Sequence, residues 1–421
     1  MMFRDKEKTQ DDQKQAGENV MKFRSGSVFC SVVFTVLYTC GFPVVSFAKD
    51  CSQTSVGFTP LNDLGSGLYL GQFEGGLYAG GMNVPPVDHD LAGLAAAQMV
   101  QPLDINGQPS PDGHYILLSI GMSNTTQEFC SVGGGEPCDP WTFMGQAADN
   151  PLVNHQELVI INGARGGQAA ATWDNPADQN YDRVRDDILL PRGLSEAQVQ
   201  VVWVKQADPV PHVSLPDPAA DAYQLRNYLA DIARAVRVRY PNSKIIFFSS
   251  RIYAGYADTN LNPEPYAYES GFAVKWVIDA QVQQMAGGAV DPDIGDLNYA
   301  TAAPWLAWGP YLWADGINPR SDGLVWLCDD MQSDGTHPAR DAEEKVGAML
   351  LDFMLNSPYA APWFRAENGQ IPGDLDNDGD VDQADLGILL SCYEINDCGD
   401  IDGDGDTDQA DLGLLLANYT G

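Results

Sequence analysis

A serine, a histidine and an aspartate stand where they could form a nucleophilic triad. Asp334 and His337 lie three residues apart in the motif DGTHP at 334–338, so the carboxylate can hold one imidazole nitrogen while the other nitrogen stays available. Ser123, in the turn GMSN at 121–124, supplies a hydroxyl from far earlier in the chain. Such a set activates serine for attack on an acyl carbon. We therefore expect Ser123, Asp334 and His337 to be catalytic.

The segments that carry these residues predict a parallel α/β domain. Ser123 follows the apolar run 115–120, which has the length of a buried strand, and Gly121 permits a sharp turn at its carboxyl end. Further strands are predicted at 157–161, 199–204, 244–250 and 305–313, and helices at 221–240, 273–285 and 341–355. This alternation favours a parallel sheet with helices on both faces, whose sites lie at the carboxyl ends of the strands.

Two other strand ends carry groups that could stabilise an oxyanion. The strand at 157–161 runs into NGARGGQ at 162–168, where two glycines leave their backbone amides accessible to a developing negative charge. We expect the Gly167 amide to be a donor, with Gly166 as the alternative. After the strand at 199–204, the Gln206 side-chain amide is the expected second donor, and Lys205 is its rival. An ordinary loop role remains the alternative for both Gln206 and Lys205.

The order of these segments resembles the SGNH (GDSL-type) hydrolases. GMSN and DGTHP resemble the first and fifth blocks of that superfamily. The six-residue spacing from Gly167 to Trp173 is similar to the glycine-to-tryptophan spacing in the sialate O-acetylesterase-like branch. The resemblance covers residues 110–365. It implies a three-layer, flavodoxin-like SGNH-hydrolase fold, a Gly167 amide in the oxyanion hole and catalysis without a cofactor. The third block departs from the family, because VWVKQAD at 202–208 replaces GxND or WxQGE.

This resemblance implies a secreted serine esterase that hydrolyses O-acetyl or other short acyl esters, with carbohydrates as the expected substrates. A lipid or thioester hydrolase is an alternative within the same chemistry. Because the third block departs from the family pattern, a second alternative is a non-catalytic surface or scaffold protein that binds glycans through a degenerate hydrolase fold.

The carboxyl-terminal part contains an acidic loop pattern twice, DxDxDGDxDxxD. Oxygen ligands at loop positions 1, 3, 5, 7, 9 and 12, with a glycine at position 6, match the preference of calcium for about six to eight oxygen ligands. Each loop is followed by one apolar segment, at 386–393 and 412–419, which predicts a helix. We expect two structural calcium ions, held by Asp374, Asp376, Asp378, Asp380, Asp382 and Asp385 and by Asp400, Asp402, Asp404, Asp406, Asp408 and Asp411.

These repeats resemble a type I dockerin, because each has aspartate at position 12, a single helix per loop and a near-identical partner repeat. The resemblance spans residues 373–421 and implies a cohesin-like protein as a candidate partner. However, loop positions 10 and 11 are Gln-Ala in both repeats, where dockerins usually carry a small hydroxylated pair. The sequence therefore favours a calcium-stabilised module, EF-hand-like in its loops, over any specific partner.

The amino-terminal region indicates export. A basic stretch that begins at Met21, an apolar run at 27–45 and the small residues around Ala48 predict a signal peptide at 21–48, preceded by a polar extension at 1–20. A retained membrane anchor is the alternative. We expect a secreted or cell-surface protein, extracellular or periplasmic in a bacterium. Between this segment and the catalytic domain at 111–365, residues 51–110 are predicted to form an extension packed on that domain.

Cysteines and charge agree with this assignment. Removal of the predicted signal peptide leaves six of the eight cysteines, an even number in an oxidising compartment. We expect Cys130 to pair with Cys138 and Cys392 with Cys398, and by elimination Cys51 with Cys328. A linker is predicted at 366–372. The net charge of −35 over 421 residues argues against nucleic acids and anionic membrane surfaces as partners.

Overall fold

The structure is a computed structural model that describes residues 48–420, except 132, 134, 367–372, 377–379 and 403–404. The expected extension at 1–20, the signal peptide up to residue 47, all of the linker after residue 366, and the ligands Asp378 and Asp404 lie outside the described residues. Within the described ranges, no helix has both the length and the hydrophobicity that a bilayer crossing requires.

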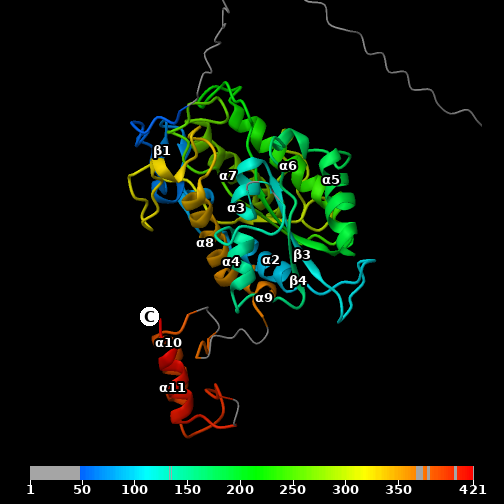
Figure 1. The fold of residues 1–421 in the computed structure, drawn as a ribbon, viewed down its shortest axis with the longest axis vertical. Helices are drawn as coiled ribbons and strands as arrows, with labels where there is room; N and C mark the ends of the chain where they lie inside the picture. Colours follow the sequence, from blue (N-terminus) through cyan, green and yellow to red (C-terminus); the bar gives the residue numbers. More distant parts are fainter. Residues whose placement is uncertain are drawn as a thin grey trace, which may run out of the picture. The chain divides into compact units, whose positions relative to one another are not determined.

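A five-stranded parallel sheet forms the centre of the larger domain (Figure 1). Its strands lie in the order β4-β3-β5-β6-β7, and every neighbouring pair is parallel. Their bounds are β3 (Tyr115–Gly121), β4 (Leu158–Asn162), β5 (Val199–Lys205), β6 (Ile245–Phe248) and β7 (Trp305–Trp308). The chain leaves β3 for β4 on one side and returns to β5 on the other, so the winding direction reverses at β3. Sites on open α/β sheets lie at such a reversal.

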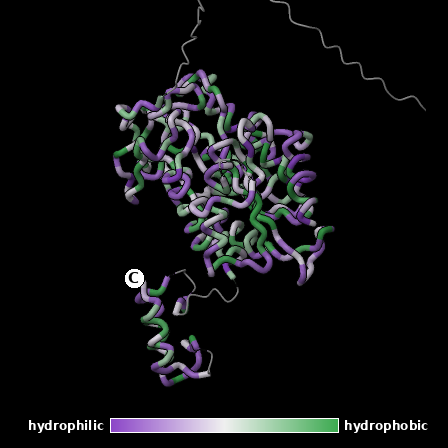
Figure 2. Tube along the Cα trace, in the orientation of Figure 1, coloured by the Kyte–Doolittle hydropathy of each residue, from purple (hydrophilic) through white to green (hydrophobic). Residues whose placement is uncertain are grey.

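Helices cover this sheet in two groups. Helices α6 and α7 pack against one another, while α8 packs against α3 and α4. All residues of β3, β5, β6 and β7 are buried, as expected for strands covered on both faces, and Figure 2 shows a continuous hydrophobic stretch where Figure 1 labels β3 and β4. The predicted three-layer α/β fold is confirmed. The α-helices are α3 (Ser123–Phe129), α4 (Phe143–Asp149), α5 (Gln179–Arg183), α6 (Asp221–Arg239), α7 (Tyr266–Met285), α8 (Arg340–Asn356) and α9 (Ala361–Phe364). The other helical segments are the π-helix η3 (Val184–Leu189) and the 3-10 turns η2 (Ala170–Thr172), η4 (Leu190–Arg192), η5 (Glu196–Gln198) and η6 (Cys328–Asp330).

Helix α7 starts seven residues before its predicted beginning at 273. Its added first turns carry Tyr268 and Phe272, which are buried against Phe58 and Tyr69 of the preceding segment. Aromatic contacts between segments that are distant in sequence therefore extend this helix, and a local periodicity cannot reveal them.

The segment before the sheet packs along the edge strand β7. It contains α1 (Leu61–Leu64), β1 (Leu68–Tyr69), β2 (Phe73–Glu74), η1 (Ala79–Gly81) and α2 (Val87–Ala97). Two indole N–H groups of β7 donate to backbone carbonyls of this segment: Trp305 Nε1 to the His89 carbonyl at 3.0 Å and Trp308 Nε1 to the Leu77 carbonyl at 2.7 Å. The Cys51–Cys328 disulfide ties the start of this segment to the turn η6, which precedes α8. This segment covers an otherwise unpaired sheet edge.

The carboxyl-terminal module has a small core of its own. Helices α10 (Gln383–Cys392) and α11 (Gln409–Ala417) pack together around Val381, Leu389 and Leu415. Both start three residues before the predicted position, because Asp382 and Asp408 cap them by accepting the Ala384 and Ala410 N–H groups. The other two expected disulfides are also present, Cys130–Cys138 and Cys392–Cys398.

Candidate active site

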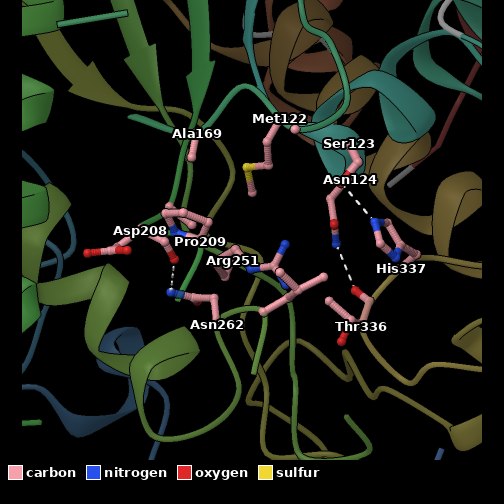
Figure 3. Close-up of a pocket in the computed structure, with 13 residues that line it drawn as sticks. Met122, Ser123, Asn124, Ala169, Asp208, Pro209, Arg251, Asn262, Thr336 and His337 are labelled. Atoms are coloured by element: carbon pink, nitrogen blue, oxygen red, sulfur yellow. Dashed lines mark hydrogen bonds between the residues drawn. The ribbon is translucent and has the colours of Figure 1, made fainter. Parts of the chain in front are cut away.

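The structure brings the three predicted triad residues together at the carboxyl end of β3. Ser123 Oγ lies 2.8 Å from His337 Nε2, a bond drawn in Figure 3, and His337 Nδ1 lies 2.6 Å from Asp334 Oδ2. The second Asp334 oxygen, Oδ1, accepts the backbone N–H groups of Thr336 and His337, each at 3.0 Å. This arrangement can hold the imidazole with Nε2 facing the serine hydroxyl, as base catalysis at serine requires.

The loop that carries Asp334 and His337 depends on the glycine between them. Gly335 has φ +68°, and a Cβ at this position would overlap the Tyr256 carbonyl. The neighbouring Thr336 is buried; its carbonyl accepts the Asn124 side-chain N–H at 3.0 Å. The histidine loop is thus bonded to the residue that follows the serine, which fixes the two halves of the triad against each other.

Ser123 is the first residue of α3, directly after β3. Gly121 allows this close turn, since a Cβ there would overlap the Thr125 side chain, whose hydroxyl donates to the Lys205 carbonyl at 2.7 Å. A fully buried ion pair between Glu128 of α3 and Lys205 at the end of β5 adds a second tie. Burial lowers the pKa of Lys205 to about 8 and raises the pKa of Glu128, while their mutual attraction opposes both shifts. The pair holds the serine helix on the sheet, and it occupies Lys205, which therefore cannot be the rival oxyanion donor.

The predicted oxyanion donors Gly166 and Gly167 lie close to Ser123, whereas Gln206 does not line the cavity. Gly167 lines the cavity next to Ser123, and a Cβ on Gly166 would lie 3.8 Å from the Ser123 Cβ. Within the described part of the chain, no acceptor takes the Gly166 or Gly167 N–H. Gln206 is buried outside the cavity lining, and its Nε2 donates to the Gln168 carbonyl at 3.3 Å. The structure therefore does not place the Gln206 side chain at the predicted oxyanion site.

A cavity of about 290 Å³ opens beside Ser123 and His337. Its lining combines apolar side chains such as Met122 with the polar residues Asp208, Arg251 and Asn262, to which no sequence motif assigned a role (Figure 3). Arg251 follows β6, so its position at the carboxyl end of a strand was the available signal. The lining residues all come from the sheet domain and none from residues 51–110: Met122, Ser123, Asn124, Gly167, Ala169, Ala207, Asp208, Pro209, Arg251, Leu261, Asn262, Thr336 and His337.

The charge of Asp334 is stabilised by its bonds. Partial burial by itself would raise the pKa of this carboxyl, but the bonds from the His337 side chain and from the backbone N–H groups of His337 and Thr336 outweigh it. The pKa of Asp334 therefore lies well below its usual range, and the residue stays a carboxylate at any pH at which the protein would act. A permanent negative charge at Nδ1 favours an imidazole that can accept a proton at Nε2.

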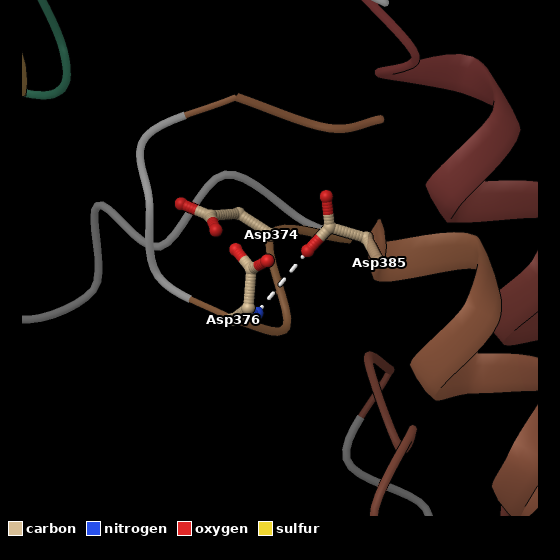
Figure 4. Close-up of side chains that lie close together, drawn as sticks. All are labelled: Asp374, Asp376 and Asp385. Carbon is tan, nitrogen blue, oxygen red and sulfur yellow. Dashed lines mark hydrogen bonds between the residues drawn. The ribbon is translucent and has the colours of Figure 1, made fainter. Parts of the chain in front are cut away.

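The acidic loops of the carboxyl-terminal module gather carboxylate oxygens. One oxygen each from Asp374, Asp376 and Asp385 lies within 4.8 Å of the other two (Figure 4), and Asp400, Asp402 and Asp411 repeat the arrangement. The remaining described ligands form analogous groups around Asp385 and Asp411, with Asp380 and Asp382 in the first loop and Asp406 and Asp408 in the second. Oxygen-only groups of this kind fit a hard divalent cation such as calcium.

No protein-family model matches the chain, and no curated protein matches it. Similar solved structures include a carbohydrate esterase family 2 enzyme plus carbohydrate-binding domain from Corynascus thermopiles (Myceliophthora fergusii). The match has 14% sequence identity and a TM-score of 0.30, and it covers 58% of this chain and 66% of that chain. A putative GDSL-like lipase from Parabacteroides merdae has 11% identity over 60% of this chain and 97% of that chain, with a TM-score of 0.30. An extracellular lipase from Streptomyces rimosus has 14% identity over 56% of this chain and 99% of that chain, with a TM-score of 0.28. The chain thus spans just under two thirds of the first of these structures, and the fold assignment rests on the strand order and direction described above.

Proposed function

We propose that this chain is a serine ester hydrolase of the SGNH type, in which Ser123 is the nucleophile, His337 the general base and Asp334 the orienting carboxylate. One observation carries the proposal: Ser123 Oγ, His337 and Asp334 form a continuous hydrogen-bonded chain, at 2.8 Å and 2.6 Å, beside an open cavity. Acyl chemistry requires a serine hydroxyl, an oriented base and room for a substrate, and all three meet here.

In the proposed reaction, Ser123 Oγ attacks the ester carbonyl carbon while His337 Nε2 takes its proton. The tetrahedral intermediate collapses as His337 returns that proton to the departing alcohol oxygen, which leaves an acyl group on Ser123. Water then attacks the acyl carbon while His337 Nε2 takes one of its protons, and His337 returns that proton to Ser123 Oγ as the acyl–oxygen bond breaks and the carboxylic acid leaves. The backbone N–H groups of Ser123 and Gly167, with Gly166 as the alternative, are the proposed oxyanion donors.

We propose O-acetyl or other short acyl esters on carbohydrates as substrates, a choice supported by the likeness of GMSN and the glycine segment to carbohydrate acetylesterases. The apolar side chains of Met122, Pro209 and Leu261 in the cavity wall favour a longer acyl chain as the second candidate, which would make the protein a lipid or thioester hydrolase. A panel of acetylated sugars and nitrophenyl esters of increasing chain length separates the two. The proposal expects the highest kcat/KM for acetyl esters, and a strong preference for long chains would replace it.

The position of Gln206 outside the cavity favours a third candidate, a glycan-binding protein without catalysis. The same panel decides this point when wild type is compared with Ser123→Ala and, as a matched control, with Ser52→Ala at an exposed serine. An esterase loses its turnover only in Ser123→Ala. Glycan binding with no turnover in wild type would instead establish the non-catalytic candidate.

For the carboxyl-terminal module we propose two structural calcium ions and, through it, attachment to a cohesin-like protein, after export of the chain to the cell surface or medium. The grouped oxygens of the two loops support calcium, and the three disulfides support an oxidising compartment. Calorimetric titration of the intact protein with calcium should give two sites per chain. A matching titration that shows no heat above dilution would contradict the calcium assignment.

A further inference from the structure

Arg251 is a buried cation in the cavity wall. The residue is only 2% exposed, yet it lines the same cavity as Ser123 and His337. Its guanidinium makes no hydrogen bond to any residue in the described ranges and has no carboxylate within the 4.0 Å of an ion pair, and its Nε is buried without a partner. Burial of a charge without a partner is costly, so buried arginines are normally paired.

The carboxylates around Arg251 are bonded to other groups. Glu128, Glu264 and Asp334 act on its charge from a distance, but Glu128 is paired with Lys205 and Asp334 with His337. Glu264 accepts the Trp313 indole N–H at 2.8 Å and the Ala254 and Tyr268 backbone N–H groups, each at 3.0 Å. These charges offset part of the cost of a buried guanidinium, and they leave its N–H donors unoccupied.

The cavity presents these donors to a ligand. Figure 3 shows the Arg251 guanidinium between Asn124 on the triad side and Asn262 on the opposite side, while the Asp208 side-chain carboxylate points away from it. Asn262 is held by a bond from its Nδ2 to the Asp208 carbonyl at 3.0 Å. A planar guanidinium has five N–H donors in a fork that matches the two oxygens of a carboxylate.

We infer that Arg251 is a specificity-determining residue that binds a carboxylate of the ester substrate, so that acidic esters are preferred over uncharged ones. The inference deepens the proposed esterase function and rests on it. The carboxylate can belong either to the alcohol part, as in an O-acetylated uronic acid, or to the acyl part, as in a hemiester of a dicarboxylic acid. Both sources present the same two oxygens at the same cation.

The test uses two pairs of substrates with the full-length protein. The first pair is the methyl glycoside of an O-acetylated uronic acid and its carboxamide; the second is nitrophenyl hemisuccinate and its succinamate. A charge-assisted, bidentate bond should raise kcat/KM for the acid over the amide by on the order of tenfold to a hundredfold in one pair. The pair that shows the preference identifies the side of the ester that carries the carboxylate. Equal rates for acid and amide in both pairs would overturn the inference.

Variants assign the preference to Arg251. Arg251→Met keeps an apolar stem of similar length and should reduce the acid-to-amide ratio to near one, and Arg251→Lys should retain an intermediate ratio because it keeps the charge but not the fork. The matched control is Arg226→Met, because the Arg226 guanidinium bonds to Asn227 outside the cavity; its ratio should equal that of wild type. An undiminished ratio in Arg251→Met would overturn the inference, and should that variant fail to fold, the wild-type ratio and Arg251→Lys decide.

A binding measurement separates this inference from the proposed function. Calorimetry with Ser123→Ala compares the affinity for each acid and its amide without turnover. If no ester is hydrolysed but the acid binds at least tenfold more tightly than the amide, the proposed function fails and the role of Arg251 stands. If esters are hydrolysed and neither rates nor affinities distinguish acid from amide, the proposed function stands and the role of Arg251 fails.

Discussion

Asp334→Asn isolates the contribution of the carboxylate to the proposed chemistry. Asparagine has nearly the same shape, and its amide oxygen can still accept the two backbone N–H groups of Thr336 and His337 that Asp334 Oδ1 accepts at 3.0 Å. Its NH₂ group then faces His337 Nδ1, where Asp334 Oδ2 lies at 2.6 Å in the wild type. Because an NH₂ donates, the ring must accept at Nδ1 and carry its proton on Nε2.

That tautomer points an N–H at Ser123 Oγ and cannot take the serine proton. The expected loss in kcat is about a thousandfold to ten-thousandfold, which corresponds to roughly 4 to 5 kcal/mol in the activation barrier. The loop keeps its backbone bonds, so the melting temperature should change little. The loss should therefore appear in kcat, since the cavity that binds the ester is unchanged.

The assay measures kcat and KM on an acetyl ester together with thermal unfolding of each variant. Asp341→Asn is the matched control, because Asp341 is an exposed aspartate just after the histidine loop; it should behave as wild type. A folded Asp334→Asn enzyme that retains kcat within tenfold of wild type would refute the assignment of Asp334 as the residue that sets the tautomer of His337.

Three further predictions concern the loop, a buried acid and the metal. Gly335→Ala should destabilise the protein by about 1 to 3 kcal/mol and reduce activity, whereas Gly323→Ala, also at positive φ but with open space around it, should lose less in a thermal melt and keep its activity. Burial raises the pKa of Glu269 from 4.5 to about 7, so the folded state keeps a proton that the unfolded chain loses as the pH rises. The stability that this proton provides is complete below about pH 4.5 and is lost towards pH 7. In Glu269→Gln, the free energy of unfolding should therefore fall less across this window than in wild type, by up to about 3 kcal/mol. Parallel pH profiles of the two proteins would contradict this. Chelation of calcium should remove a separate low-temperature transition of the carboxyl-terminal module in calorimetry and leave esterase activity unchanged, while an unchanged calorimetric trace would speak against structural calcium.

The sequence predicted those parts of the fold and site that depend on local patterns. The apolar runs located the five strands, and the spacing within DGTHP located a carboxylate and an imidazole that bond to one another. The three disulfide pairs followed from cysteine spacing and elimination. Each of these features depends on residues that are near in sequence or on a small number of combinations.

The residues that were missed or misplaced depend on contacts between distant segments. Glu128 and Lys205 form a buried pair only because α3 returns across the end of β5. Gln206 was expected in the site, but the turn after β5 directs its side chain to the Gln168 carbonyl. Arg251 reaches the cavity because β6 lies beside β5 in the sheet. The direction of a side chain after a strand end depends on the packing of neighbouring loops, which composition and periodicity do not encode.

The pairing of Ser123 with His337 is tested most directly by the reaction of the intact protein with a fluorophosphonate, followed by peptide mass spectrometry. We expect one phosphonyl adduct per chain, located on Ser123, which forms slowly or not at all in His337→Gln because the hydroxyl, 2.8 Å from Nε2, then lacks its base. No adduct on Ser123 in a folded protein, or labelling of Ser123 at the same rate without His337, would contradict the claim that these two groups act together.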